Sequence, residues 1–177
     1  TYSLQYLLDT YLNDPIFLLA VIGLLLLLIA FFRKFLPYIP TDDKTVKNIK
    51  KLAGKGKNKK AVDLGSGDGR IVIALAQAGY QTHGYEINPF LIWRSRRKIR
   101  KMGLENKAFI HFGNFWKKDL SAFDLVVVYG ITYVMDDLKE KFRQELENRA
   151  QLICNTYTFK NWKYSKKADK AYLYKLI

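Results

Sequence analysis

The feature that most constrains the fold of this chain is a glycine-rich turn at residues 61–70, with the sequence AVDLGSGDGR. Its apolar start predicts a short buried strand, and the residues from Arg70 onward predict a helix. Gly65, Gly67 and Gly69 permit the positive φ angles of a tight turn and let a ligand approach the backbone. Ligands bind at the carboxyl edge of the first strand of an α/β sheet, so we expect a binding site here.

The charges of this turn indicate a ligand that carries cationic groups. In a dinucleotide-binding turn the third glycine falls one position later than Gly69, and the phosphate-binding sequence that ends in Gly-Lys-Ser/Thr is absent. Instead, Asp63 precedes the first glycine and Asp68 lies inside the turn, where both carboxylates would repel a pyrophosphate. The ammonium and sulfonium groups of S-adenosylmethionine suit such a turn. The alternative is an ordinary glycine-rich connection between a strand and a helix.

A third acid indicates that the ligand contains a nucleoside. Glu86 lies at the expected end of the second strand, within residues 84–89 (GYEINP). In nucleoside-binding α/β units, a carboxylate at this position accepts hydrogen bonds from the ribose hydroxyls. The residues expected to bind S-adenosylmethionine are therefore Asp63, Gly65, Ser66, Gly67, Asp68, Gly69 and Glu86.

Strands and helices alternate from Lys60 onward, which predicts a parallel sheet with helices on both faces. The expected strands lie near residues 60–64, 82–87, 108–112, 124–130 and 150–157, and the expected helices near residues 70–78, 89–102 and 136–149. Two further strands, near 162–165 and 171–177, have no helix between them and should form an antiparallel hairpin. The predicted fold class is thus α/β, a Rossmann-like, doubly wound, seven-stranded sheet. Before it, Thr41 is expected to cap a short helix that ends at Gly54.

Residues 16–32 are apolar and uncharged, which predicts one transmembrane helix. A helix of that length spans about 25 Å, near the short limit for crossing a bilayer. A signal peptide would have a basic start and a small-residue cleavage site, and a buried core helix would show a polar face; neither pattern is present. We therefore divide the chain into residues 1–36, with the membrane helix, and a domain at residues 37–177. Because the chain starts at Thr1, we expect its natural N-terminus to be missing or processed.

The distribution of charge predicts the orientation of the chain in a membrane. The net charge is +14, and every lysine and arginine lies from Arg33 onward. By the positive-inside rule, the domain is expected on the cytoplasmic side, or on the matrix side in a mitochondrion. The lysines from Lys44 to Lys60 and the basic helix at 89–102 either face solvent or contact anionic lipid headgroups. Nucleic acid is disfavoured as a partner, because no recognised RNA-binding motif accompanies these charges.

No metal site is predicted. His83, His111 and Cys154 are far apart in the sequence, and no cluster of histidine, cysteine and carboxylate residues has the spacing of metal ligands.

Residues 63–72 (DLGSGDGRIV), together with residues 84–89, resemble the class I, seven-stranded S-adenosylmethionine-dependent methyltransferases. More narrowly, the apolar segment and the connector Pro-Tyr-Ile-Pro at residues 37–40 resemble the single-pass protein-lysine methyltransferases that modify the mitochondrial adenine nucleotide translocase and the ATP synthase c-subunit, and their prokaryotic relatives. The resemblance extends from the apolar segment through Trp162.

The chain departs from this family at two positions. After the third strand, Asn114 and Phe115 stand where the family often has Asp-Leu, and the resemblance implies that they contact the adenine of the cofactor. Near the C-terminus the family has Phe-Pro-x-Pro-x-Trp, whereas this chain keeps the aromatic residues Tyr157 and Trp162 without the prolines.

The resemblance implies transfer of a methyl group to an accessible lysine of a membrane protein. An aromatic channel would favour the neutral lysine amine by desolvation. Tyr38, Tyr129 and Trp162 are the expected catalytic residues, and Tyr133 is a further candidate; core positions are the alternative for each. Two other functions stay open, a small-molecule or phospholipid N-methyltransferase and a non-catalytic membrane scaffold that binds the methyl donor.

Overall fold

The computed structural model describes residues 12–33, 38–130, 132–147 and 149–175 of the chain. The chain divides into two compact units, Thr1–Tyr38 and Ile39–Ile177. The division expected from the sequence lies two residues earlier, between residues 36 and 37.

Helix α2 (Pro15–Arg33) forms in the N-terminal unit where the sequence is apolar. The backbone N–H of Ile16 donates a hydrogen bond of 2.9 Å to Asp14 Oδ1, which satisfies one of the free amides at the start of the helix. Within the part of the chain that the structure describes, no helix is both long enough and apolar enough to span a membrane. The transmembrane helix predicted at residues 16–32 is therefore not found there.

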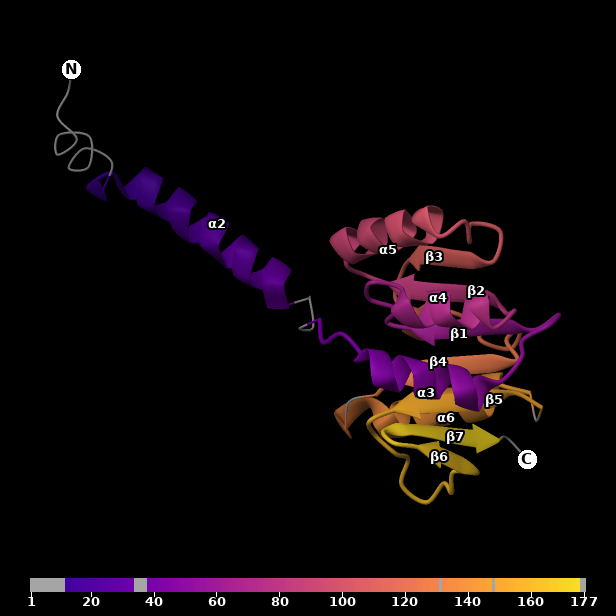
Figure 1. Ribbon diagram of the computed structural model, residues 1–177. Helices are drawn as coiled ribbons and strands as arrows, with labels where there is room; N and C mark the ends of the chain where they lie inside the picture. Colours follow the sequence, from indigo (N-terminus) through magenta and orange to yellow (C-terminus); the bar gives the residue numbers. More distant parts are fainter. Residues whose placement is uncertain (1–11, 34–37, 131, 148, 176–177) are drawn as a thin grey trace. The chain divides into compact units, whose positions relative to one another are not determined.

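The second unit is built on one mixed sheet (Figure 1). Its strands are β1 (Lys60–Leu64), β2 (Gln81–Glu86), β3 (Ala108–Phe112), β4 (Leu125–Tyr129), β5 (Gln151–Asn155), β6 (Lys166–Ala168) and β7 (Ala171–Lys175). Its helices are α3 (Asp43–Ala53), α4 (Arg70–Gln77), α5 (Pro89–Lys101) and α6 (Met135–Glu145), with short 3-10 helices η1 (Phe115–Lys117) and η2 (Thr132–Val134). The strand order is β3-β2-β1-β4-β5-β7-β6. Strands β1 to β5 pair in parallel, whereas β7 is antiparallel to both β5 and β6, so the predicted seven-stranded fold class is confirmed.

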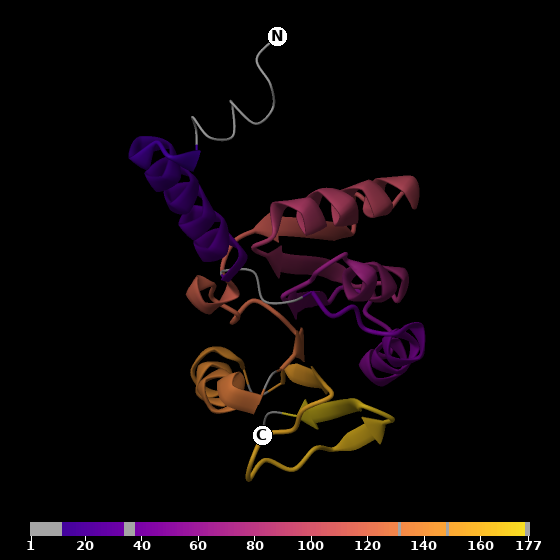
Figure 2. The same ribbon diagram turned by 90° about the vertical axis from the view of Figure 1, so that its left-hand side faces the viewer.

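Alternate strand residues enter two different cores, because successive side chains of a strand point to opposite faces of the sheet. On one face, Val62 and Leu152 belong to the same buried cluster as Phe142 of α6. On the other face, Ala61 and Leu125 pack with α3 and α4, and α5 continues this layer over β3. Figure 2 shows α3, α4 and α5 on one side of the sheet and α6 on the other. The prediction of helices on both faces is confirmed.

Strands β1 to β4 end at one edge of the sheet, which places the segments that follow them side by side. In the observed register, Leu64 pairs with Tyr85 of β2 and with Val128 of β4, while Glu86 pairs with Phe112 of β3. The glycine turn after β1, the entry to α5 after β2 and the loop after β3 therefore meet at this edge, called the carboxyl edge below.

Two local predictions are wrong. Asp42 caps α3 in place of Thr41, because its carboxylate accepts a hydrogen bond of 2.9 Å from the backbone N–H of Thr45. The first hairpin strand is Lys166–Ala168 and not residues 162–165. Trp162 is instead half-buried and packs against Phe159 and Tyr174 at the border of the core, so the chain at that point contributes to packing and not to sheet pairing.

Phe142 of α6 is fully buried between the helix and the sheet, so its truncation should be costly. We expect Phe142→Ala to lower the free energy of unfolding by about 3–5 kcal/mol, because the smaller side chain leaves a cavity. Phe112→Ala, at a side chain that is 68% exposed, is the matched control and should change stability little. Urea unfolding of both variants checks this; equal losses would contradict the packing described.

Candidate ligand-binding site

The turn after β1 is a tight bend that needs glycine. Gly65 and Gly69 have φ angles of 79° and 78°, a region that side chains strongly disfavour. A Cβ at Gly69 would lie 2.8 Å from the Cβ of Ser95, because α5 packs closely against the bend. At Gly65 an added Cβ would meet nothing within 4 Å, so this part of the bend faces open space. The backbone N–H groups of Gly65 and Ser66 both donate to the carbonyl of Tyr85, at 3.0 Å each, which fastens the bend to β2.

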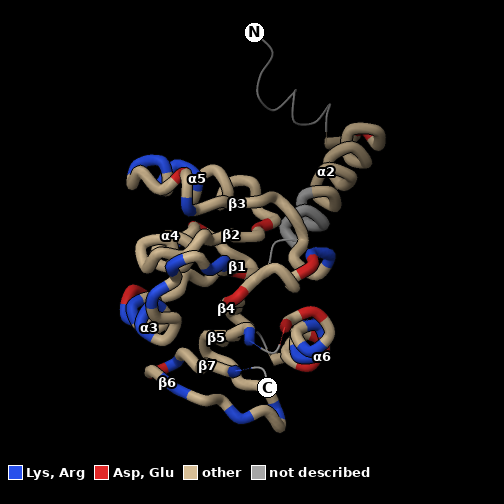
Figure 3. Tube along the Cα trace, turned by 90° about the vertical axis from the view of Figure 1, so that its right-hand side faces the viewer, with Lys and Arg blue, Asp and Glu red and all other residues tan. Residues whose placement is uncertain are grey.

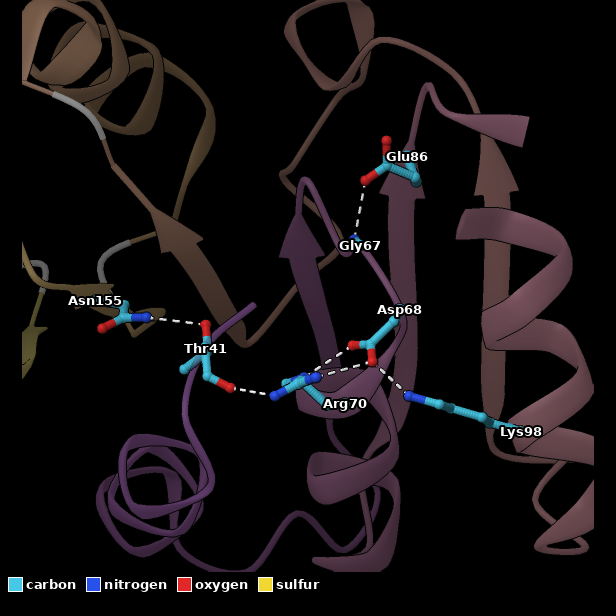
Figure 4. Close-up of polar contacts among 7 residues, drawn as sticks. All are labelled: Thr41, Gly67, Asp68, Arg70, Glu86, Lys98 and Asn155. Atoms are coloured by element: carbon cyan, nitrogen blue, oxygen red, sulfur yellow. Dashed lines mark hydrogen bonds and ion pairs between the residues drawn. The ribbon is translucent and has the colours of Figure 1, made fainter. Parts of the chain in front are cut away.

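Glu86 joins the bend to the start of α5 (Figure 4). Its Oε2 accepts a hydrogen bond of 2.9 Å from the backbone N–H of Gly67. Its Oε1 accepts bonds of 2.8 Å each from the N–H groups of Ile87 and Asn88. The structure thus brings Glu86 to the glycine bend, as the sequence predicts for a shared site. A carboxylate has about four lone-pair sites, so Glu86 retains the capacity to accept a hydrogen bond from a ligand.

Asp63, at the end region of β1, is buried and lies among other acids. Burial raises the pKa of Asp63 to about 8, and the negative charges of Glu86 and Asp68 add to the rise. A cationic ligand group beside these carboxylates would relieve their mutual repulsion. The site therefore contains the carboxyl groups that a positively charged ligand needs beside it.

Asp68 is held by two basic residues, Arg70 and Lys98, toward which its carboxylate points (Figure 4). The guanidinium of Arg70 donates to both carboxylate oxygens, at 2.9 and 3.0 Å, and Lys98 Nζ of α5 also donates to Oδ2. Burial by itself would raise the pKa of Asp68, but the hydrogen bonds and charges of Arg70 and Lys98 outweigh burial and hold this pKa below its ordinary value. Asp68 therefore stabilises the bend, and its predicted contact with the ligand stays a prediction.

Arg70 also connects the bend to Thr41 and Asn155, two residues that the sequence did not indicate as part of the site. Arg70 Nη1 donates to the carbonyl of Thr41, just before α3. Thr41 Oγ1 in turn accepts a hydrogen bond of 3.1 Å from Asn155 Nδ2, at the buried end of β5 (Figure 4). The sequence pattern predicts this strand as far as residue 157, but Thr156 has a φ of 73° and ends it earlier, so Asn155 is the last residue of the strand.

The residues predicted to contact adenine lie in the loop after β3. Asn114 Oδ1 accepts a hydrogen bond of 3.0 Å from the backbone N–H of Trp116 and so caps η1. The Phe115 ring is half-buried and lies 5.1 Å from the ring of Trp116. Both predicted residues are at the carboxyl edge, and their role in binding stays a prediction. In the described part of the chain, Ser66 Oγ is a buried side-chain polar atom without a hydrogen-bond partner, so it has unused capacity beside the bend.

Of the predicted catalytic aromatics, Tyr129 and Trp162 have different surroundings. Tyr129 ends β4 at the carboxyl edge, half-buried, with its ring edge-to-face to Tyr157 at 6.3 Å. Trp162 instead packs at 5.3 Å against Tyr174, which pairs with Leu152 near the start of β5 and away from that edge. The predicted catalytic role of Trp162 stays a prediction.

Tyr38 belongs to the N-terminal unit, and the side chain of Tyr133 lies outside the described residues. For both, the predicted role stays a prediction.

The raised pKa of Asp63 gives a testable dependence of stability on pH. The folded chain keeps this proton up to about pH 8, whereas the unfolded chain releases it near its ordinary pKa of 3.8. The stabilising contribution of Asp63 is therefore complete below pH 4 and is lost as pH rises through 8. Without ligand, we expect the melting temperature of Asp63→Asn to rise relative to that of the native chain between pH 5 and pH 8, and the difference to level off above. Thermal melts across this range check it; a difference that stays constant from pH 5 to pH 9 would refute the assignment.

The family model of the ANTKMT methyltransferase domain matches residues 63–166. The ATP synthase c-subunit lysine N-methyltransferase of Xenopus laevis is 39% identical over 127 residues, which are 72% of this chain and 56% of that protein. The adenine nucleotide translocase lysine N-methyltransferase of mouse is 33% identical over 71% of this chain and 55% of its own length. The chain thus spans about half the length of these relatives. A protein-lysine N-methyltransferase of Saccharolobus islandicus is 32% identical over 71% of this chain and 80% of its own length.

Solved structures share the fold. The RNA methyltransferase of Salinibacter ruber, in complex with S-adenosyl-L-homocysteine, has a TM-score of 0.74 at 24% identity and covers 78% of this chain and 94% of its own. A methyltransferase from Thiobacillus denitrificans, also with S-adenosyl-L-homocysteine, has a TM-score of 0.57 at 15% identity, covering 66% of this chain and 49% of its own. The family model covers more than half of the sequence and the archaeal relative is matched over most of its length, so this chain belongs to the family of the ANTKMT methyltransferase domain.

Proposed function

We propose that this chain is an S-adenosylmethionine-dependent protein-lysine N-methyltransferase that acts on a membrane protein. The observation that carries the proposal is the glycine bend bonded to Glu86 at 2.9 Å, with the buried carboxyl of Asp63 beside it. The relatives support it, since they are named as lysine N-methyltransferases of the ATP synthase c-subunit and of the adenine nucleotide translocase. The solved neighbours that contain S-adenosyl-L-homocysteine support the choice of donor.

The residues of the bend fit the methyl donor. The open space at Gly65 leaves room for the donor beside the backbone. Glu86 is placed to accept hydrogen bonds from ribose hydroxyls, and Asp63, once ionised, to compensate the positive charge of the ammonium or sulfonium group. When bound, the donor would supply an electrophilic methyl group on sulfur. The lone pair of a neutral lysine amine would form the new N–C bond as the C–S bond breaks, S-adenosylhomocysteine would leave, and the methylated ammonium would lose one proton to solvent.

The acceptor lysine has to lose its charge before it reacts, and the carboxyl edge offers a place where this is favourable. Tyr129 and Tyr157 are half-buried and contact each other there, next to the buried end of β5. An aromatic, partly desolvated surface lowers the pKa of a lysine that enters it. Tyr129 therefore stays the residue proposed to contact the acceptor.

Attachment to a membrane through α2 is part of the proposal. Apolar side chains are exposed around this helix, including Ile16, Leu19 and Leu27 at 76%, 69% and 70%. Apolar surface of this extent is unfavourable in water and indicates contact with lipid or protein. With lysine and arginine confined to the chain from Arg33 onward, we place the catalytic unit on the cytoplasmic side, or the matrix side in a mitochondrion.

Loss of the Glu86 charge should weaken donor binding. In Glu86→Gln the side-chain amide cannot accept all of the hydrogen bonds that the carboxylate accepts, and charge-assisted bonds contribute about 1.5–3 kcal/mol each. We expect binding of S-adenosylmethionine to weaken at least about tenfold by calorimetry. Glu105→Gln, at an exposed glutamate away from the bend, is the matched control and should bind as the native chain does. Equal affinities of the two variants would count against the site.

The reaction is tested by incubating the native chain with membranes and tritiated S-adenosylmethionine. We expect the label in protein, and methyllysine after acid hydrolysis of that protein. Label in the lipid extract would show a phospholipid methyltransferase instead. Donor binding without transfer to any membrane component would show a non-catalytic scaffold. Glu86→Gln should lose most of the label under the same conditions, at donor concentrations that only half-saturate the native chain.

Membrane attachment is tested with a change confined to α2. Leu24→Lys combined with Leu25→Lys places charge on an apolar helix, and each charge is costly in the hydrocarbon region. In vesicle flotation we expect the native chain to float and the double variant to stay at the bottom of the gradient. Lys139→Glu, at a surface position of α6, is the control for a change of net charge that lies outside α2. Flotation of the double variant to the same extent as the native chain would refute attachment through α2.

A further inference from the structure

Helix α5 has one buried face and one exposed face of unusual composition. Its buried residues, Leu91, Ile92, Ser95 and Ile99, pack toward the sheet. The exposed stripe, called the α5 stripe below, consists of Phe90, Trp93, Arg94, Arg97 and Lys101, which share one side of the helix. Phe90 is 62% exposed and Trp93 is 55% exposed. The stripe thus presents aromatic rings at its start and cationic groups along its length, and these residues line one shallow pocket together with Lys98.

The aromatic end of this stripe lies beside the ligand-binding site. Helix α5 begins at Pro89, directly after the Glu86 segment that bonds to the glycine bend. Phe112, which is 68% exposed, ends β3 at the same edge and, by strand alternation, lies on the sheet face that α5 covers. Ile87, at 40% exposure, precedes the helix. Exposed apolar side chains therefore border the carboxyl edge on the α5 side.

The geometry of the rings distinguishes between two kinds of partner. The Phe90 and Trp93 rings stack on each other with centroids 5.9 Å apart, and the guanidinium of Arg97 lies 5.6 Å from the Trp93 ring centre. Single-stranded nucleic acid needs open ring faces on which bases stack. Here one face of each ring is already turned to the other ring, and Arg97 also lies over Trp93, so less ring face is open for base stacking than in a free aromatic platform. Ring edges of tryptophan and phenylalanine beside basic groups suit the headgroup region of a membrane.

The positive charge of α5 indicates that a matching membrane would contain anionic lipids. Helix α5 contains arginine and lysine but no acidic residue, and Figure 3 shows these basic positions along it. Two of its cations are used within the fold, since Lys98 binds Asp68 and Arg96 donates to the carbonyl of Ile110. The cations of the α5 stripe are exposed and face the same way as the aromatic rings. They match the negative surface of a bilayer that contains anionic lipids.

We propose that the α5 stripe is a docking surface for an anionic lipid bilayer, with Phe90 and Trp93 inserted at the boundary between headgroups and acyl chains and Arg94, Arg97 and Lys101 on lipid phosphates. This contact is made by the catalytic unit itself and is separate from any attachment through α2. It turns the carboxyl edge toward the lipid surface, where a lysine close to the membrane is within reach. The proposal does not depend on methyl transfer.

The test reads out the contact of Trp93 with lipid in the full chain. Trp116→Phe with Trp162→Phe leaves Trp93 as the single tryptophan, and Trp93→Phe with Trp116→Phe leaves Trp162 as the control. Vesicles contain phosphatidylcholine with about one third phosphatidylserine, with bromine on the acyl chains as quencher. We expect Trp93 fluorescence to fall about twofold and Trp162 fluorescence to stay unchanged. Pure phosphatidylcholine, 0.5 M salt, or Arg94→Glu with Arg97→Glu should each remove most of the quenching, because the attraction is electrostatic.

Two outcomes would overturn the proposal. One is equal quenching of the two tryptophans, or quenching that persists in neutral vesicles and in the charge-reversed variant. The other is a change of Trp93 fluorescence with an oligouridine but not with vesicles, which would assign the stripe to nucleic acid.

Replacing Trp162, which packs against the core, alters the packing of the chain that is tested. Hydrogen exchange of the unsubstituted chain therefore gives a second readout. The amides of residues 90–97 should exchange more slowly with anionic vesicles than with neutral ones, and unchanged exchange would refute docking. Neither readout involves the methyl donor, so a failure here is distinct from a failure of the proposed enzyme activity.

Discussion

The carboxylate of Glu86 is the group on which the carboxyl edge depends. It accepts the N–H of Gly67 from the bend after β1 and the N–H groups of Ile87 and Asn88 at the entry to α5. Charge-assisted bonds to backbone amides are short and strong, and the positive end of a helix favours a negative acceptor. The Glu86 side chain thereby joins three segments: the bend after β1, the end of β2 and the start of α5, the helix that carries the α5 stripe.

The acids around the bend have different roles because their partners differ. Asp68 is neutralised within the fold by Arg70 and Lys98, which hold its pKa below the ordinary value. Asp63 has burial and two neighbouring acids around it, which raise its pKa to about 8. A fold that keeps such a carboxyl buried loses stability above its unfolded pKa, and a cationic ligand recovers part of that loss. Asp63 is therefore the acid that we propose for the cationic group of the ligand, while Asp68 is paired within the fold.

Arg70 extends this arrangement beyond the bend. Through the carbonyl of Thr41 it ties the start of α3 to the glycine turn, and through the Thr41 hydroxyl the tie continues to Asn155 at the end of β5. The turn after β1 and the end of β5 are thus linked by hydrogen bonds to the segment that enters the domain. Arg70 therefore contacts both the entry to the domain and the bend.

The sequence by itself determined the elements of this domain and the core of its site, because hydrophobic period, glycine position and capping residues are local signals. They placed β1, β3, α4 and α5 within a residue of their observed bounds, and they named Glu86 as the partner of the bend. Only the tertiary structure decided what depends on distant contacts. The pairing of Asp68 with Lys98, the link from Thr41 to Asn155, and the withdrawal of Trp162 into the core beside Tyr174 all join residues far apart in the chain. No local pattern encodes such contacts, because they arise when the packed sheet brings separate strand ends and helix faces together.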